Sequence, residues 1–174
     1  MAYLTRSELL TAYGDNATEA ITAQQHRDFV ESVMVYGALV TNQQRDKSTT
    51  TATDATAKLE FDVSPFAYGM TADPINNNFA NFEEGHYEMG LEIDILLGGN
   101  NVTYTLGLYA DGVLVGDTIS FNPTDVGSRF ITSIMSPFNV IANAGTLDVR
   151  LSSSSAQTCT IFVLNWLMKR LGSN

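Results

Sequence analysis

Between His86 and Leu97, apolar and polar residues alternate with a period of two, a pattern that predicts a β-strand with one buried face. Successive side chains of a strand point to opposite faces of its sheet. The polar face here carries His86, Glu88, Glu92 and Asp94. The buried face then carries Tyr87, Met89, Leu91, Ile93, Ile95 and Leu97.

The residues that follow repeat this pattern between turn signals. Gly98 to Asn101 turns the chain and 104–110 alternates again, so we expect 86–97 and 104–110 to be adjacent antiparallel strands. Asp111-Gly112 predicts a type I′ hairpin, because both central residues of that turn need a positive φ. Further strands are expected at 59–63, at 113–121, at 129–135 before Pro137, and at 146–151.

The closing segment, 158–171, is apolar on both of its faces. A strand with two apolar faces must be shielded from water on both sides. In a single sandwich the other sheet shields one face, so a neighbouring subunit is expected to shield the second. We therefore expect an oligomer with this segment at its centre. The predicted interface between subunits comprises Cys159, Ile161, Phe162, Val163, Leu164, Trp166 and Met168.

About eight short strands with no helices between them favour a mainly β fold, an antiparallel jelly-roll β-sandwich over residues 59–174. An immunoglobulin-like sandwich is the alternative. Its paired cysteines around a tryptophan are absent, because Cys159 is the only cysteine. Cys159 has apolar neighbours and is expected to be a buried small side chain.

The pattern of residues 1–40 predicts a short α-helical N-terminal anchor. Two capping boxes, Thr5 to Glu8 and Thr22 to Gln25, predict two helix starts. The second helix carries an apolar stripe that must pack on something. Residues 41–58 are polar and rich in Thr, which predicts a linker or arm, although Thr also suits an extended edge strand.

Acidic residues outnumber basic residues by 19 to 9, for a net charge of −10, and 61–128 contains no Lys or Arg. Because a phosphate backbone is bound by clustered basic side chains, no nucleic-acid partner is expected. No apolar run approaches the roughly 20 residues of a transmembrane helix, and residues 1–11 lack the order of a secretory signal. No membrane partner is expected either.

The sequence offers no catalytic constellation. His26 and His86 lie in different predicted elements, and the serines at 152–155 have no nucleophile-elbow motif. His86 lies near several glutamates, which predicts a solvated acidic face, with weak divalent-cation binding as the alternative. We therefore expect no enzyme activity, no cofactor and no metal site.

Two parts of the chain resemble known families. The segments 108–121 (LYADGVLVGDTISF) and 145–161 (GTLDVRLSSSSAQTCTI), with a closing strand that ends in KRLG, resemble the tumour-necrosis-factor-like (TNF-like) jelly rolls of phage and other viral surface proteins. That resemblance implies a homotrimer associated through apolar inner sheets. The segment 16–33 (NATEAITAQQHRDFVESV) resembles the N-terminal segments of phage fibre and head-decoration proteins, which implies an attachment element.

Capsid-bound cement proteins are expected to combine a helical anchor, a Thr-rich arm and a trimeric knob, which here would be the jelly-roll domain. The sequence therefore predicts a phage capsid decoration protein on the outer surface of the virion, with the major capsid protein or another virion protein as partner. The alternative is a head- or tail-fibre knob that binds a host receptor or glycan, and a cellular jelly-roll ligand ranks third. Capsid attachment is assigned to Ile21, Arg27, Phe29, Val30, Val33 and Met34.

Overall fold

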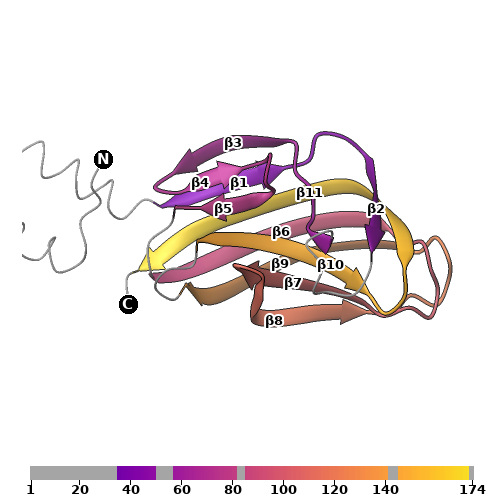
Figure 1. Cartoon of the computed structure of the whole chain (residues 1–174). Coiled ribbons are helices and arrows are strands. Elements are labelled where there is room, and N and C mark those ends of the chain that lie inside the picture. Colours follow the sequence, from indigo (N-terminus) through magenta and orange to yellow (C-terminus); the bar gives the residue numbers. More distant parts are fainter. Residues whose placement is uncertain (1–34, 50–56, 82–84, 141–144, 173–174) are drawn as a thin grey trace, which may run out of the picture.

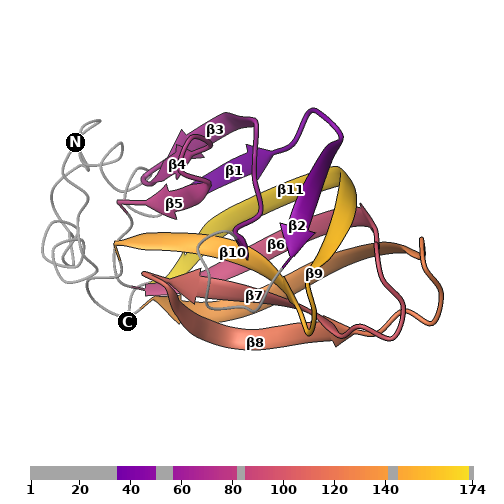
Figure 2. The ribbon, with the colours of Figure 1, turned by 45° about the vertical axis from the view of Figure 1, so that its right-hand side comes forward.

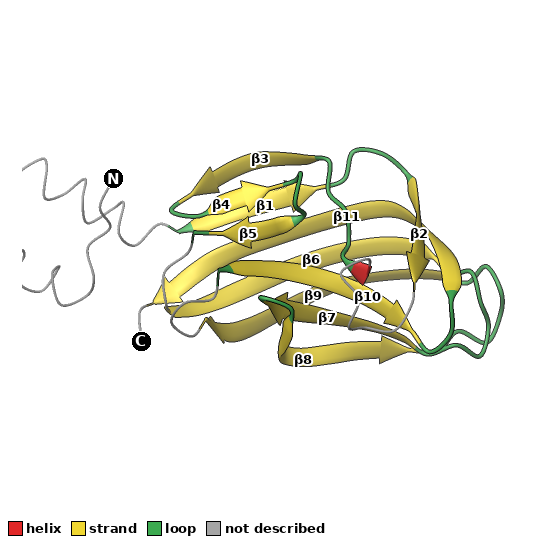
Figure 3. Ribbon diagram, viewed as in Figure 1, coloured by secondary structure: helices red, strands yellow, loops and turns green. Residues whose placement is uncertain are grey.

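The computed structural model describes residues 35–49, 57–81, 85–140 and 145–172. Strands account for nearly all of the regular structure in these ranges (Figures 1 and 3). One sheet contains β1 (Tyr36–Val40), β2 (Arg45–Thr49), β3 (Val63–Tyr68), β6 (Gly85–Leu96), β9 (Arg129–Val140) and β11 (Gln157–Gly172). The other contains β4 (Thr71–Asp73), β5 (Asn78–Ala80), β7 (Tyr104–Ala110), β8 (Val113–Phe121) and β10 (Thr146–Ser153).

The two sheets, called sheet A and sheet B in the order just given, face each other as a sandwich (Figure 2). Sheet A has the order β3-β1-β11-β6-β9, and β2 pairs with β11 beyond the end of β1. Sheet B has the order β4-β5-β10-β7-β8. All strand pairs are antiparallel and most neighbours are distant in sequence, which confirms the predicted jelly-roll sandwich.

The core lies between the sheets and is filled by alternate residues of the long strands. All six apolar residues predicted for the buried face of 86–97 are buried. They meet inward side chains of sheet B, among them Leu106, Leu108, Leu147, Val149 and Leu151. The period-two pattern thus correctly identified which face of β6 is buried in the core.

The prediction that 86–97 and 104–110 are adjacent strands is wrong. β6 lies in sheet A beside β9 and β11, whereas β7 lies in sheet B beside β8 and β10. Alternation shows which face is buried but does not distinguish a neighbour in the same sheet from one across the core. The crossing between the sheets begins at Gly98, where a Cβ would lie 1.9 Å from the carbonyl oxygen of Thr158.

Of two further turn predictions, the one at Asp111-Gly112 is confirmed and the one at Pro137 is wrong. Asp111 and Gly112 have φ values of 47° and 83° and connect β7 to β8, which confirms the predicted type I′ hairpin. Pro137, expected to follow the end of a strand, lies within β9, which continues to Val140. Among the described strands β9 pairs with β6 alone, which makes it an edge strand, and an edge strand tolerates a residue without an N–H group.

A β-bulge in β11 explains why this strand is apolar on both sides. The register with β6 shifts between Ile161 and Val163, so inward positions are odd-numbered before the bulge and even-numbered after it. Cys159 and Ile161 point into the core on one side of the bulge, and Leu164, Trp166 and Met168 do so on the other.

The predicted trimer interface is therefore corrected for five of its seven residues. Cys159, Ile161, Leu164, Trp166 and Met168 are at most 2% exposed, because they pack in the chain's own core. The sequence interpretation assumed an unbroken alternation along the whole strand. Phe162 and Val163, at the bulge, are only partly buried.

The boundary predicted at residue 59 is also corrected. β1, placed in the N-terminal anchor by the sequence, lies between β3 and β11 in sheet A. β2, placed in the linker, pairs with β11 through five residues, in agreement with the alternative of an extended edge strand. The predicted helices and every residue assigned to capsid attachment lie outside the described residues.

Candidate interaction surface

The outer face of sheet A carries cross-strand rows of side chains that can be read from the register. One row contains Phe66 of β3, Ala38 of β1, Leu167 of β11 and Gly90 of β6. Phe66 is 47% exposed and Leu167 is 50% exposed. The exposed apolar surface of this row therefore comes from Phe66 and Leu167, with the buried Ala38 between them.

An aromatic group lies beside this row. Tyr36 meets Phe66 edge to face with ring centroids 5.7 Å apart, and it stacks on Tyr68 at 6.1 Å. All three side chains come from the β1–β3 pair and point away from the core. Such ring pairs hold one another in place, so this apolar surface is largely preorganised.

Polar groups flank the apolar row on both sides. Lys169 and Glu88, opposite one another on β11 and β6, form an ion pair, and Asn165 donates a hydrogen bond to Glu92 at 2.8 Å. Between the ion pair and the aromatic group lies a groove of about 280 Å³. It is lined by Tyr36, Gly37, Phe66, Glu88, Gly90, Leu167, Met168 and Lys169. An apolar centre with a polar rim is the usual composition of a protein interface.

The far part of the same face contains the bulge residue Phe162. The Arg129 guanidinium lies over its ring, 5.0 Å from the centroid, and donates two hydrogen bonds to Asp94, at 2.7 and 2.5 Å. These hydrogen bonds and the positive charge of Arg129 lower the pKa of Asp94. Ile131, opposite Asp94 on β9, is exposed and extends the apolar surface.

A second group of charged side chains lies on the face of sheet B that points away from the core. The Asp148 carboxylate, on β10, accepts hydrogen bonds from Arg150 at 2.6 and 3.1 Å and pairs with Lys58 at 3.0 Å. The Arg150 guanidinium also lies over the ring of Tyr109. The buried carboxylate therefore joins β10 to the segment at Lys58, and both cations offset the cost of burying its charge.

Cys159, predicted to be buried, is 1% exposed, which confirms that prediction. Burial raises the pKa of its thiol, so the unreactive protonated form is favoured. Within the described ranges, no three His, Cys, Asp or Glu residues approach closely enough to hold a metal ion. The same ranges contain no helix long and apolar enough to cross a bilayer.

No protein-family model matches the chain, and no curated protein matches it. The globular domain of the zebrafish complement 1qA protein is similar in structure, with 9% sequence identity, a TM-score of 0.54 and coverage of 80% of this chain and 99% of that one. Eiger TNF from S. frugiperda is similar at 11% identity, with a TM-score of 0.57 and coverage of 81% and 95%. The PRD1 vertex protein P5 matches at 13% identity and a TM-score of 0.48, with coverage of 80% and 99%.

The likenesses to complement 1qA and to Eiger TNF confirm that the sandwich is a jelly roll of the TNF and C1q type. At 9% and 11% identity they show the fold alone.

Proposed function

We propose that this protein is a non-enzymatic structural subunit of a virus particle that assembles as a homotrimer through the outer face of sheet A. The observation that carries the proposal is the exposed apolar row of Phe66 and Leu167 with its polar rim. Burying one large apolar side chain contributes about 1.5–3 kcal/mol, and a symmetric assembly repeats that gain at each contact. The row replaces the five core residues as the proposed trimer contact.

The virion location is supported by sequence features rather than by the sandwich. The resemblance of residues 16–33 to the N-terminal segments of phage head-decoration proteins favours attachment through residues 16–34, with Ile21, Arg27, Phe29, Val30, Val33 and Met34 as the proposed contacts. Three attachment segments joined to one trimeric knob would bind a capsid lattice with avidity. The proposed role is capsid decoration, which strengthens the shell by contacting several capsid subunits.

Light scattering coupled to size-exclusion chromatography tests the assembly. The wild-type chain is expected to elute as three copies, and Leu167→Asp as a folded monomer, because the new carboxylate would be desolvated at the contact. Ile75→Asp is the matched control, since Ile75 is exposed at the β4–β5 turn of sheet B. A monomeric wild type, or an intact Leu167→Asp trimer, contradicts the proposed contact.

A second experiment tests the location. A chain lacking residues 1–34 retains all described strands, so we expect it to remain a trimer but to lose binding to particles depleted of the protein. Retained particle binding by the shortened chain would show that the attachment lies elsewhere. Binding to host cells in place of empty shells would favour the alternative function of a receptor-binding fibre knob.

A further inference from the structure

Apart from its backbone pairing with β11, β2 is held to the sandwich by charged side chains rather than by apolar ones. Its five residues, Arg45-Asp46-Lys47-Ser48-Thr49, include no apolar side chain. The register with β11 places Lys47 opposite Cys159 and Arg45 opposite Ile161, so both basic side chains point to the core side of the sheet. A strand without apolar side chains gains little hydrophobic free energy to offset the entropy of ordering it.

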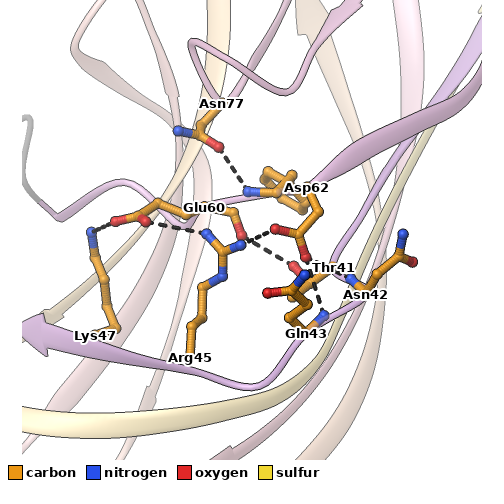
Figure 4. Close-up of polar contacts among 9 residues, drawn as sticks. Thr41, Asn42, Gln43, Arg45, Lys47, Glu60, Asp62 and Asn77 are labelled. Carbon is orange, nitrogen blue, oxygen red and sulfur yellow. Dashed lines mark hydrogen bonds and ion pairs between the residues drawn. The ribbon is translucent and has the colours of Figure 1, made fainter.

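The basic side chains meet two carboxylates from the segment that precedes β3, as Figure 4 shows. Arg45 pairs with Glu60 at 3.2 Å and also with Asp62, and Lys47 pairs with the other oxygen of Glu60 at 3.1 Å. Asp62 additionally accepts the backbone N–H groups of Asn42 and Gln43, at 2.7 and 3.2 Å. One cluster of charges thus holds both β2 and the turn that leads into it.

This cluster is exposed on one side and buried on the other. The Glu60 side chain is 46% exposed while that of Lys47 is 8% exposed, and Arg45 Nε is buried without a hydrogen-bond partner. Partly exposed ion pairs contribute little net free energy and are screened by salt, and the buried cations carry a desolvation cost. β2 is therefore expected to have a lower local stability than the apolar strands.

β2 covers two features of β11. The backbone of β2 pairs with Gln157–Ile161, whose N–H and C=O groups would otherwise be unpaired at the edge of the sheet. β2 also lies beside Cys159, the chain's single cysteine. On the core side of the sheet, the hydroxyl groups of Thr49 and Ser153 share a hydrogen bond of 2.6 Å. Removal of β2 would open a path to Cys159 from the side of Lys47.

We propose that β2 is a salt-sensitive latch, which detaches locally while the sandwich stays folded, exposes the edge of β11 at Gln157–Ile161 and gives reagents access to Cys159. The charge cluster of Arg45, Lys47, Glu60 and Asp62 sets how often the latch opens.

The reaction of Cys159 with a disulfide reagent such as Ellman's reagent, followed in the full chain without denaturant, tests this latch. Glu60→Gln removes the carboxylate shared by both cations, and we expect its labelling rate to exceed that of the wild type by roughly tenfold or more. Wild-type labelling is expected to accelerate on going from low salt to about 1 M salt, where the Debye length falls to about 3 Å. Asp73→Asn, a carboxyl-to-amide change in sheet B, is the control and should label at the wild-type rate.

Hydrogen exchange separates local opening from global unfolding. In Glu60→Gln, the amides of β2 should exchange faster, whereas those of β6 and β10 should exchange as in the wild type. Equal acceleration of β2 and β6 would overturn the latch, because it would show that the whole sandwich opens. A Glu60→Gln labelling rate equal to that of the wild type would overturn it as well.

Discussion

The rings of Phe79 and Trp166 meet edge to face with their centroids 4.6 Å apart, and this contact joins sheet B to sheet A. Both side chains are fully buried, and the ring of Phe61 also packs on the indole, with the centroids 5.8 Å apart. The contact also explains Gly37, where a Cβ would lie 2.7 Å from the ring of Phe79. Trp166 is therefore a central core residue of one chain.

Trp166→Ala is expected to destabilise the fold by about 3–5 kcal/mol, because it removes the largest buried side chain and leaves a cavity. Chemical denaturation followed by circular dichroism measures this change. Leu167→Ala, at the next residue but on the exposed face, should change the free energy of unfolding much less. A stable Trp166→Ala chain that fails only in self-association would instead support the trimer interface expected from the sequence.

Gly98→Ala is expected to prevent correct folding or to lower the melting temperature strongly. The new Cβ would meet the Thr158 backbone carbonyl, which cannot move without displacing β11. Gly127→Ala is the comparison, since Gly127 has a φ of 77° and a Cβ added there would have no atom within 4 Å. It should cost only about 1 kcal/mol of backbone strain. Equal melting temperatures for the two variants would contradict the close approach.

Asp111 should contribute to the acid sensitivity of the protein. Hydrogen bonds from the Gly145 N–H and from the N–H and hydroxyl of Thr146 lower its pKa below the ordinary value of 3.8. Because the folded-state pKa is depressed, the stabilisation is fully present above 3.8 and is lost as the pH falls through the lower, folded-state pKa.

Asp111→Asn removes this titration while keeping a residue that tolerates positive φ at the hairpin. The free energy of unfolding, measured from neutral pH down to about pH 2, should therefore fall less steeply below the ordinary carboxyl pKa in the variant than in the wild type. Parallel pH profiles for the two proteins would show that the Asp111 contacts do not stabilise the fold.

Local sequence patterns predicted much of the sandwich. The alternation in β6 identified its buried face, Asp111-Gly112 identified a hairpin, and Cys159 was correctly placed in the core. Each of these depends on the chemistry of a few consecutive residues. The exposed row of Phe66 and Leu167 could not be found in this way, because its members are about a hundred positions apart and meet only through the register of β3, β1 and β11.

The amino-acid sequence alone determined that this chain forms antiparallel strands with one buried face. In an extended backbone, successive side chains point to opposite faces, so alternating apolar residues gather on one of them. Only the tertiary structure decided which sheet each strand joins and where the alternation of β11 reverses. A bulge changes the outward face through a single unpaired residue, Phe162, and its position is defined by the pairing of β11 with β6. For that physical reason Trp166 lies in the core and Leu167 faces outward.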